Sequence, residues 1–212
     1  FMTPQTINAY YDPTTNEICF PAGILQAPFF DPAADDAANY GAIGVVIGHE
    51  MTHGFDDQGS QFDKDGNLRN WWTPQDKANF KARTQRMIRC FDGIEVLPGL
   101  HCNGALTCGE NIADHGGLKV AYQAFRNATS SRPLADFGGF TPDQRFFISY
   151  GQIWANNIRP EALRNQVKTD PHAPARWRVN GALPQIEAWY KAFGIKKGDK
   201  LFVPKNKRVD IW

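Results

Sequence analysis

The stretch VVIGHEMTHGFDD, residues 45–57, decides how this chain folds and what chemistry it can support. It contains His49, Glu50 and His53 in a His-Glu-x-x-His pattern. On an α-helix, residues four apart lie one turn above each other on the same face. Two imidazoles at this spacing can bind one Zn²⁺, and the intervening glutamate is placed to accept a proton from a water on the metal. The pattern predicts a metal-binding helix; the alternative is an amphipathic helix that merely carries two histidines.

The segment before the two histidines predicts where this helix begins and how deeply it lies. Asp35 and Asp36 suit a helix N-terminus, and the helical pattern then continues to Gly54. The helix is apolar on most faces before the histidines, so we expect it to be deeply buried. The histidines would then emerge inside the protein, where a metal is shielded from bulk water.

Composition limits the classes of protein to which the chain can belong. A length of 212 residues with 42% hydrophobic residues fits one large globular domain, or a domain and a half. The formal net charge of +1 gives no electrostatic reason to expect binding to nucleic acid or an acidic membrane. The longest apolar run, around residues 43–47, is too short to cross a bilayer, and the first residues lack the features of a signal peptide.

The N-terminal residues predict an extended segment followed by an irregular apolar one. Residues 8–11 and 16–20 are typical of a hairpin, with turn residues between them. An extended strand near a metal site can pair with a peptide laid alongside it, although an ordinary edge strand has the same sequence pattern. Residues 20–30 are apolar and interrupted by proline, which favours a buried irregular segment or a pocket wall.

The remaining chain predicts helices separated by loops. Helices are expected over 74–89, from 109 to about 125, over 142–158, and over 184–193 ending at Gly194. Residues 63–67 are expected to form a turn, because Gln61 and Trp72 stand where a calcium loop needs acidic ligands. Residues 93–108, 129–139 and 170–174 are expected to be loops or short strands. The predicted fold class is mainly α with a small β-sheet beside the site helix (α+β).

A third zinc ligand is expected on another element, because zinc in a hydrolase has three protein ligands and leaves the fourth position to water. Glu110, in GENIAD (residues 109–114), is the best candidate, and Asp114 lies one turn further on the same helix face. Asp114 could then accept a hydrogen bond from a liganding imidazole, and Asp56 or Asp57 could serve the other imidazole. Without the histidine pattern, Glu110 and Asp114 would simply be a solvated helix face.

The four cysteines leave the redox environment open. Cys19, Cys90, Cys102 and Cys108 allow three pairings, and none forms a CxxC metal knuckle. Cys102 and Cys108 are close enough in sequence to close a small loop, which would indicate an oxidising compartment. Free buried thiols fit the sequence equally well.

Taken together, these motifs resemble those of a known enzyme family. NAYY (8–11), HEMTH (49–53), GENIAD (109–114) and the closing Ile211-Trp212 resemble, in order, the neprilysin family of zinc endopeptidases. That family includes the endothelin-converting enzymes and bacterial oligopeptidases. The resemblance extends over essentially the whole chain. It implies a gluzincin-type fold, with residues 1–212 as a C-terminal catalytic domain that binds one Zn²⁺.

The resemblance also implies a role for individual residues. His49, His53 and Glu110 would be the zinc ligands and Glu50 the general base, with Asp114, His172 and Arg178 completing the catalytic set. Asp114 would orient a liganding histidine, His172 would donate to the oxyanion, and Arg178 would donate to a substrate carbonyl. The substrate-binding residues would be Asn8 and Ala9 for the peptide backbone, and Ile24, Phe29, Val46, Ile153 and Trp154 for the apolar side chain after the scissile bond. Without the resemblance, His172 and Arg178 would be taken as surface residues.

The chain also departs from the family in ways that bear on its partners and location. Cysteines of the animal members are missing after Trp154 and before Ile211, which suggests a bacterial branch. Family enzymes are considerably longer, and their N-terminal half forms most of a helical lobe that roofs the cavity. We therefore expect that lobe and short peptides as partners, and a location outside the cytoplasm.

Three hypotheses for function follow from the sequence. The first is a zinc endopeptidase that cleaves oligopeptides before an apolar residue. The second is a zinc-binding chain that is inactive without the N-terminal lobe. The third is a non-enzymatic interaction domain in which the histidine pair is structural.

Overall fold

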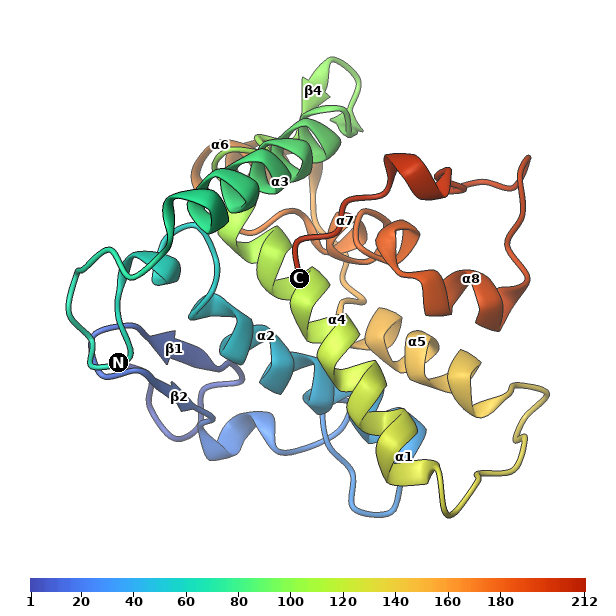
Figure 1. The fold of residues 1–212 in the computed structure, drawn as a ribbon. Helices are drawn as coiled ribbons and strands as arrows, with labels where there is room; N and C mark the ends of the chain where they lie inside the picture. Colours follow the sequence, from blue (N-terminus) through green and yellow to red (C-terminus); the bar gives the residue numbers. More distant parts are fainter.

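A computed structural model describes all residues from Phe1 to Trp212 and shows a mainly helical protein (Figure 1). The helices are α1 (Asp36–Asn39), α2 (Val45–His53), α3 (Pro74–Asp92), α4 (Cys108–Thr129), α5 (Pro142–Ile153), α6 (Pro160–Thr169), α7 (Ala175–Asn180) and α8 (Glu187–Phe193). A π-helical segment η2 (Tyr40–Gly44) joins α1 to α2, and short 3₁₀ turns are η1 (Ala22–Ile24), η3 (Gly59–Gln61), η4 (Leu183–Gln185) and η5 (Lys205–Lys207). The predicted fold class, mainly α with small sheets, is confirmed.

Two small antiparallel hairpins complete the secondary structure. Strand β1 (Tyr10–Asp12) pairs with β2 (Glu17–Cys19), with Tyr10 opposite Cys19. Strand β3 (Glu95–Leu97) pairs with β4 (Leu100–His101). The first hairpin lies beside α2, as predicted, and the second lies at the far end of α3 (Figure 1). Between the strands of the first hairpin, Asn16 takes a positive φ of 52°, a conformation that asparagine tolerates better than most residues.

Helices α2 and α4 cross at the centre of the molecule, and glycines allow their backbones to touch (Figure 1). A Cβ on Gly48 would lie 3.0 Å from the Cα of Gly117. A Cβ on Gly117 would lie 2.7 Å from the main-chain nitrogen of His49. This close approach brings the first two turns of α4, which carry Glu110 and Asp114, alongside the histidines of α2.

Two hydrophobic cores hold this crossing in place. The larger core lies between α1, α2, α4, α5 and α8, and its fully buried aromatic residues are Phe125, Phe146 and Tyr150. The smaller core lies between α3, the start of α4 and the C-terminal tail, and includes Met87, Phe91 and Ile112. Each such buried side chain contributes roughly 1.5–3 kcal/mol from the removal of apolar surface from water. Helix α4 is therefore fixed at both ends, and the site residues near its N-terminus inherit that rigidity.

The helix predicted to carry the metal ligands begins and ends where the sequence predicts, but its burial is not as predicted. Asp35 is the N-cap and accepts a hydrogen bond from the main chain of Ala38, and the helical path runs on to His53. On the side opposite the histidines, however, Ile47 is 39% and Met51 51% exposed. The expectation of burial on most faces is wrong there, because α4 and the cores cover only the side of α2 that carries His49.

Toward the C-terminus, the sequence predicted some of the helices and missed others. The helix expected over 142–158 ends at Ile153, and two helices, α6 and α7, were not predicted. Helix α6 has ten residues, and Pro160 and Glu161 in its first turn are a helix-start signal that the sequence reasoning missed; α7 has only six residues, too few for a clear helical period. The turn over 63–67 and the loop over 170–174 are confirmed.

The structure shows whether the cysteines form disulfides and whether any helix could cross a membrane. All four cysteines are free, so the small loop that Cys102 and Cys108 could have closed is not formed. Both thiols instead pack in the smaller core. None of the helices combines the length and the apolar character needed to cross a bilayer.

The glycine contact between α2 and α4 gives a stability test. We expect Gly117→Ala to destabilise the protein by roughly 1–3 kcal/mol, because the new methyl group forces the two backbones apart. Gly151→Ala on α5 is the control, because its Cβ would meet nothing within 4 Å. The control should be stabilised by roughly 0.5–1 kcal/mol, as expected for Gly→Ala in a helix. Urea unfolding measures both, and wild-type stability for Gly117→Ala would contradict the close helix contact.

Candidate metal centre

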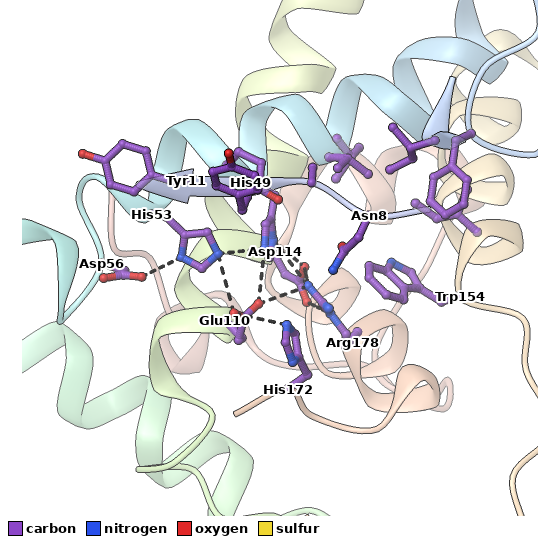
Figure 2. A pocket seen from close by; sticks show the side chains of 18 of the residues that line it. Asn8, Tyr11, His49, His53, Asp56, Glu110, Asp114, Trp154, His172 and Arg178 are labelled. Atoms are coloured by element: carbon purple, nitrogen blue, oxygen red, sulfur yellow. Dashed lines mark hydrogen bonds and ion pairs between the residues drawn. The ribbon is translucent and has the colours of Figure 1, made fainter. Parts of the chain in front are cut away.

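Two imidazoles and one carboxylate converge on a single point between α2 and α4 (Figure 2). The Nε2 atoms of His49 and His53 lie 3.0 Å apart. One oxygen of Glu110 lies 3.2 Å from Nε2 of His49, and the other lies 3.6 Å from Nε2 of His53. The histidines come from α2 and the glutamate from the first turn of α4, as the sequence predicts.

The outer nitrogens of both rings are held by buried carboxylates. Nδ1 of His49 lies 2.9 Å from Asp114, and Nδ1 of His53 lies 2.7 Å from Asp56. Because ionised carboxylates only accept hydrogen bonds, each Nδ1 must donate. The other carboxylate oxygen of Asp56, Oδ1, accepts hydrogen bonds from the main-chain N–H groups of Gln58 and Gly59. Of the two aspartates that the sequence left open, Asp56 is therefore the one that orients His53.

This arrangement leaves lone pairs facing one another. In the neutral form of each ring, with Nδ1 protonated, Nε2 carries a lone pair, and these two atoms face the anionic oxygens of Glu110. Oxygen Oε2 of Glu110 is buried and receives no hydrogen bond. A proton or a metal cation is needed to neutralise such a cluster of acceptors.

The distances between these atoms suit a tetrahedral metal ion. Ligand bonds of about 2.0–2.2 Å to zinc in a tetrahedral arrangement place the ligand atoms about 3.3 Å apart. The observed separations of 3.0, 3.2 and 3.6 Å bracket that value. The donor set, two imidazole nitrogens and one carboxylate, is also one that catalytic zinc sites use.

Two glutamates meet at the site, and their environments set them apart. A carboxylate oxygen of Glu50 also lies within 4.8 Å of a ring nitrogen of each histidine. Burial raises the pKa of Glu50 above its usual value. Burial would also raise the pKa of Glu110, but the adjacent ring of His49 and the charges of His53 and Arg178 lower it to about 2. Glu110 is thus suited to be an anionic ligand, and Glu50 to accept a proton.

The sequence alternative of a surface arginine at position 178 is wrong. Arg178 is only 6% exposed and makes two hydrogen bonds to Asp114, at 2.7 Å from Nε and 2.6 Å from Nη2. Burial would raise the pKa of Asp114, but Arg178 and His49 together lower it strongly. Burial would likewise lower the pKa of His49, but its hydrogen bond to Asp114 and the adjacent carboxylate of Glu110 raise it to about 9. The surface alternative failed because α7, which carries Arg178, was not predicted.

His172 lies at the rim of the site, on the loop before α7. Its side chain is 41% exposed, its Nε2 lies 3.3 Å from Glu110, and its Nδ1 lies 2.7 Å from Asp170. Asp170 also accepts a hydrogen bond from the main chain of His172, so it fixes both the loop and the ring. Sequence reasoning missed this role of Asp170, although an aspartate two residues before a histidine is a spacing at which such local bonds form.

A cavity of about 450 Å³ collects all the predicted site residues in one place. Its polar wall contains the predicted ligands and catalytic residues, and its other walls contain the predicted substrate-binding residues. The predicted residues that line it are Asn8, Ala9, Ile24, Phe29, Val46, His49, Glu50, His53, Glu110, Asp114, Ile153, Trp154, His172 and Arg178. Tyr11 also lines the cavity and was not predicted; it lies two residues after Ala9, the second expected substrate-binding residue.

Comparison with known proteins identifies the family to which the chain is related. Residues 8–209 match the model of peptidase family M13. Human endothelin-converting enzyme 1 is 45% identical over 217 residues, which cover 100% of this chain and 27% of that protein. Neprilysin-3 of Drosophila melanogaster is 41% identical over 215 residues, covering 100% of this chain and 27% of that protein.

A solved structure shows the same fold. The Mycobacterium tuberculosis zinc metalloprotease Zmp1, in complex with an inhibitor, matches with a TM-score of 0.97 and 48% identity, covering 100% of this chain and 33% of that one. The chain therefore spans about a third or less of the length of these relatives. The family model matches residues 8–209, nearly the whole chain. The chain therefore belongs to peptidase family M13, as the resemblance to the neprilysin family predicted.

Proposed function

We propose that residues 1–212 are the catalytic domain of a zinc-dependent endopeptidase that hydrolyses oligopeptides. One observation carries the proposal: the lone pairs of His49, His53 and Glu110 converge beside a second buried carboxylate, Glu50. A structural metal site closes its coordination sphere with four protein ligands, whereas a catalytic site keeps one position open. Membership of a peptidase family supports the same conclusion.

The metal would be held by His49, His53 and Glu110, with Asp114 and Asp56 fixing the two imidazoles from behind. Zinc at such a site lowers the pKa of the attacking water and polarises the peptide carbonyl. The protein's own contribution is to hold both Nε2 lone pairs toward one point and to keep Glu110 ionised.

Glu50 would act as the general base and then as the general acid. It would accept the proton of the attacking water and transfer it to the amine of the leaving peptide. Only 5% of Glu50 is exposed, and the resulting rise in its pKa makes it a stronger base than an ordinary glutamate at neutral pH.

The strand beside α2 offers main-chain groups for a peptide. Ala9 is buried, yet the main chains of Asn8 and Ala9 make no hydrogen bond within the protein. Buried N–H and C=O groups need partners, and an extended peptide lying along this segment would supply them. Asn8 also lines the cavity, as Arg178 does, and Figure 2 shows its side chain on the cavity side of the strand.

The apolar part of the cavity would bind the side chain after the scissile bond. Its lining consists of Ile24, Phe29, Val46, Ile153 and Trp154. Burying an apolar side chain there removes surface from water without leaving a polar group unpaired. We therefore propose a preference for an apolar residue at that position.

Arg178 and His172 line the cavity where the carbonyl groups of a peptide would lie. Nη1 of Arg178 makes no hydrogen bond within the protein while the residue lines the cavity, so it is free to donate to a substrate carbonyl. His172 is held by Asp170 through Nδ1, and its Nε2 faces Glu110 at 3.3 Å, so the protonated ring would offer Nε2 as a donor to the oxyanion. A donor aimed at a developing oxyanion is worth roughly 3 kcal/mol in such reactions.

A second candidate function is a zinc-binding chain that needs further polypeptide for turnover. Its support is the short span of the chain, 27–33% of the length of the relatives compared above. In this case an N-terminal lobe of the same protein would roof the cavity and select short peptides. A location outside the cytoplasm is part of the proposal and rests on the family resemblance alone.

Zinc content provides the first test. We expect one zinc ion per chain by elemental analysis, and Glu110→Ala to lose it. Glu161→Ala, on the exposed start of α6, is the matched control and should keep its zinc. Full zinc in Glu110→Ala would show that the third ligand lies elsewhere.

Zinc binding should also release a proton. The pKa of His49 is raised to about 9, so the metal-free ring holds a proton at pH 7 that zinc must displace from Nε2. Calorimetry at pH 7 in two buffers of different ionisation enthalpy should therefore show release of about one proton. The apparent zinc affinity should rise with pH up to about pH 9 and then level off. A pH-independent affinity between pH 6 and pH 8 would rule out this protonation state.

Glu50→Gln tests the mechanism itself. The variant should bind zinc normally but lose about 10²–10⁴ in kcat, because the amide cannot accept a proton. The assay is cleavage of a quenched peptide with leucine after the scissile bond, followed by mapping of the cut site. Wild-type chain with full zinc but no cleavage would favour the second candidate, and cleavage by clean Glu50→Gln would overturn the general-base role.

A further inference from the structure

The guanidinium of Arg178 is held on two sides by different physical interactions. Its edge makes the two hydrogen bonds to Asp114. Its face lies over the indole ring of Trp154, with 3.9 Å from Cζ to the ring centroid. Figure 2 shows the two side chains next to each other, with Arg178 between Trp154 and Asp114.

The indole contact matters because the charge is buried. A guanidinium is planar and weakly hydrated, so it stacks well on aromatic faces, and tryptophan is the best such face. The contact gains strength where water is excluded. Asp114 satisfies one edge of Arg178 but leaves both faces of the plane without a polar partner. Trp154 covers one face and limits how far the guanidinium can tilt away from Asp114.

Tyr150 contacts both Trp154 and Arg178. It is fully buried one helical turn before Trp154, and its ring meets the indole edge-on at 6.5 Å. Its hydroxyl donates to the main-chain oxygen of Arg178 at 2.9 Å. The end of α5 thus fixes the main chain of Arg178 through Tyr150 and its charged head through Trp154.

We propose that Trp154 is a positioning residue for Arg178, in addition to lining the apolar pocket. The proposal rests on the proposed function, in which Nη1 of Arg178 donates to a substrate carbonyl. Oxygen Oδ1 of Asp114 accepts from both Arg178 and His49, so the pose of the guanidinium also bears on the orientation of a zinc ligand. Arg178, stacked on Trp154, then connects the wall of the apolar pocket to the metal centre.

The two roles of Trp154 predict different dependence on substrate. If Trp154 only lines the pocket, its loss harms peptides with a large residue after the scissile bond and spares those with alanine there. If Trp154 positions Arg178, its loss harms both, because every peptide presents the same carbonyl to Arg178.

The kinetic experiment compares three variants on two peptides that differ only in having phenylalanine or alanine after the scissile bond. Trp154→Leu removes the π face, Trp154→Phe keeps one, and Ile153→Ala trims the same pocket at a residue that neither stacks on Arg178 nor bonds to it. We expect Trp154→Leu to lower kcat/KM by about tenfold or more on both peptides, the range seen when partners of a metal site are lost. Trp154→Phe should recover most of this loss, and Ile153→Ala should affect only the phenylalanine peptide.

The outcomes that would overturn the proposal are equally definite. A loss in Trp154→Leu confined to the phenylalanine peptide would reduce Trp154 to a pocket wall. No loss on either peptide would also exclude the positioning role. If Trp154→Leu does not give the amide spectrum of a folded protein, Trp154→Met takes its place.

A second readout does not depend on activity. In nuclear magnetic resonance spectra, the Nε–H proton of Arg178 should exchange slowly with water, because it is buried and bonded to Asp114 at 2.7 Å. We expect its exchange to accelerate at least about tenfold in Trp154→Leu but not in Ile153→Ala, since the stacking that holds the closed pose is lost. Unchanged exchange in Trp154→Leu would overturn the positioning role. An inactive wild-type chain that shows the expected exchange pattern would instead overturn the proposed function alone.

Discussion

The structure depends on one unfavourable arrangement, the convergence of two imidazole lone pairs and a glutamate within 3.0–3.6 Å of one another. Such a cluster is stable only if a proton or a metal cation neutralises it and if the groups behind it cannot rotate away. Buried carboxylates at Asp114 and Asp56 prevent that rotation. The glycine contact between α2 and α4 supplies the short distance between helices that lets Glu110 reach the histidines.

Charge balance explains why several ionisable groups can be buried together here. Asp114 is shared between His49 and Arg178, and Arg178 is in turn stacked on Trp154. Buried charges are tolerated when each has a partner and its remaining hydrogen-bonding capacity is satisfied. Glu50 lacks such close partners, and it is the carboxylate whose pKa rises with burial. The same network thus produces one carboxylate suited to bind a cation and another suited to accept a proton.

Sequence reasoning recovered the parts of this site that local periodicity and caps encode. His49 and His53 follow from helical spacing, Glu110 and Asp114 from the third ligand that the histidine pattern requires, and the start of the helix from Asp35. Features that depend on distant packing were not accessible, such as the burial of Arg178 on the short helix α7 and the exposed outer face of α2. The choice of Asp56 over Asp57 was also inaccessible, because it depends on the path of the turn that follows α2.

X-ray diffraction at the zinc absorption edge, on crystals of the purified chain, tests the central claim most directly. The account predicts a single anomalous peak, in contact with Nε2 of His49, Nε2 of His53 and the carboxylate of Glu110, with the side facing the cavity left to water. A peak bounded by other residues, or a fully occupied protein in which Glu110 has turned away from the histidines, would contradict it.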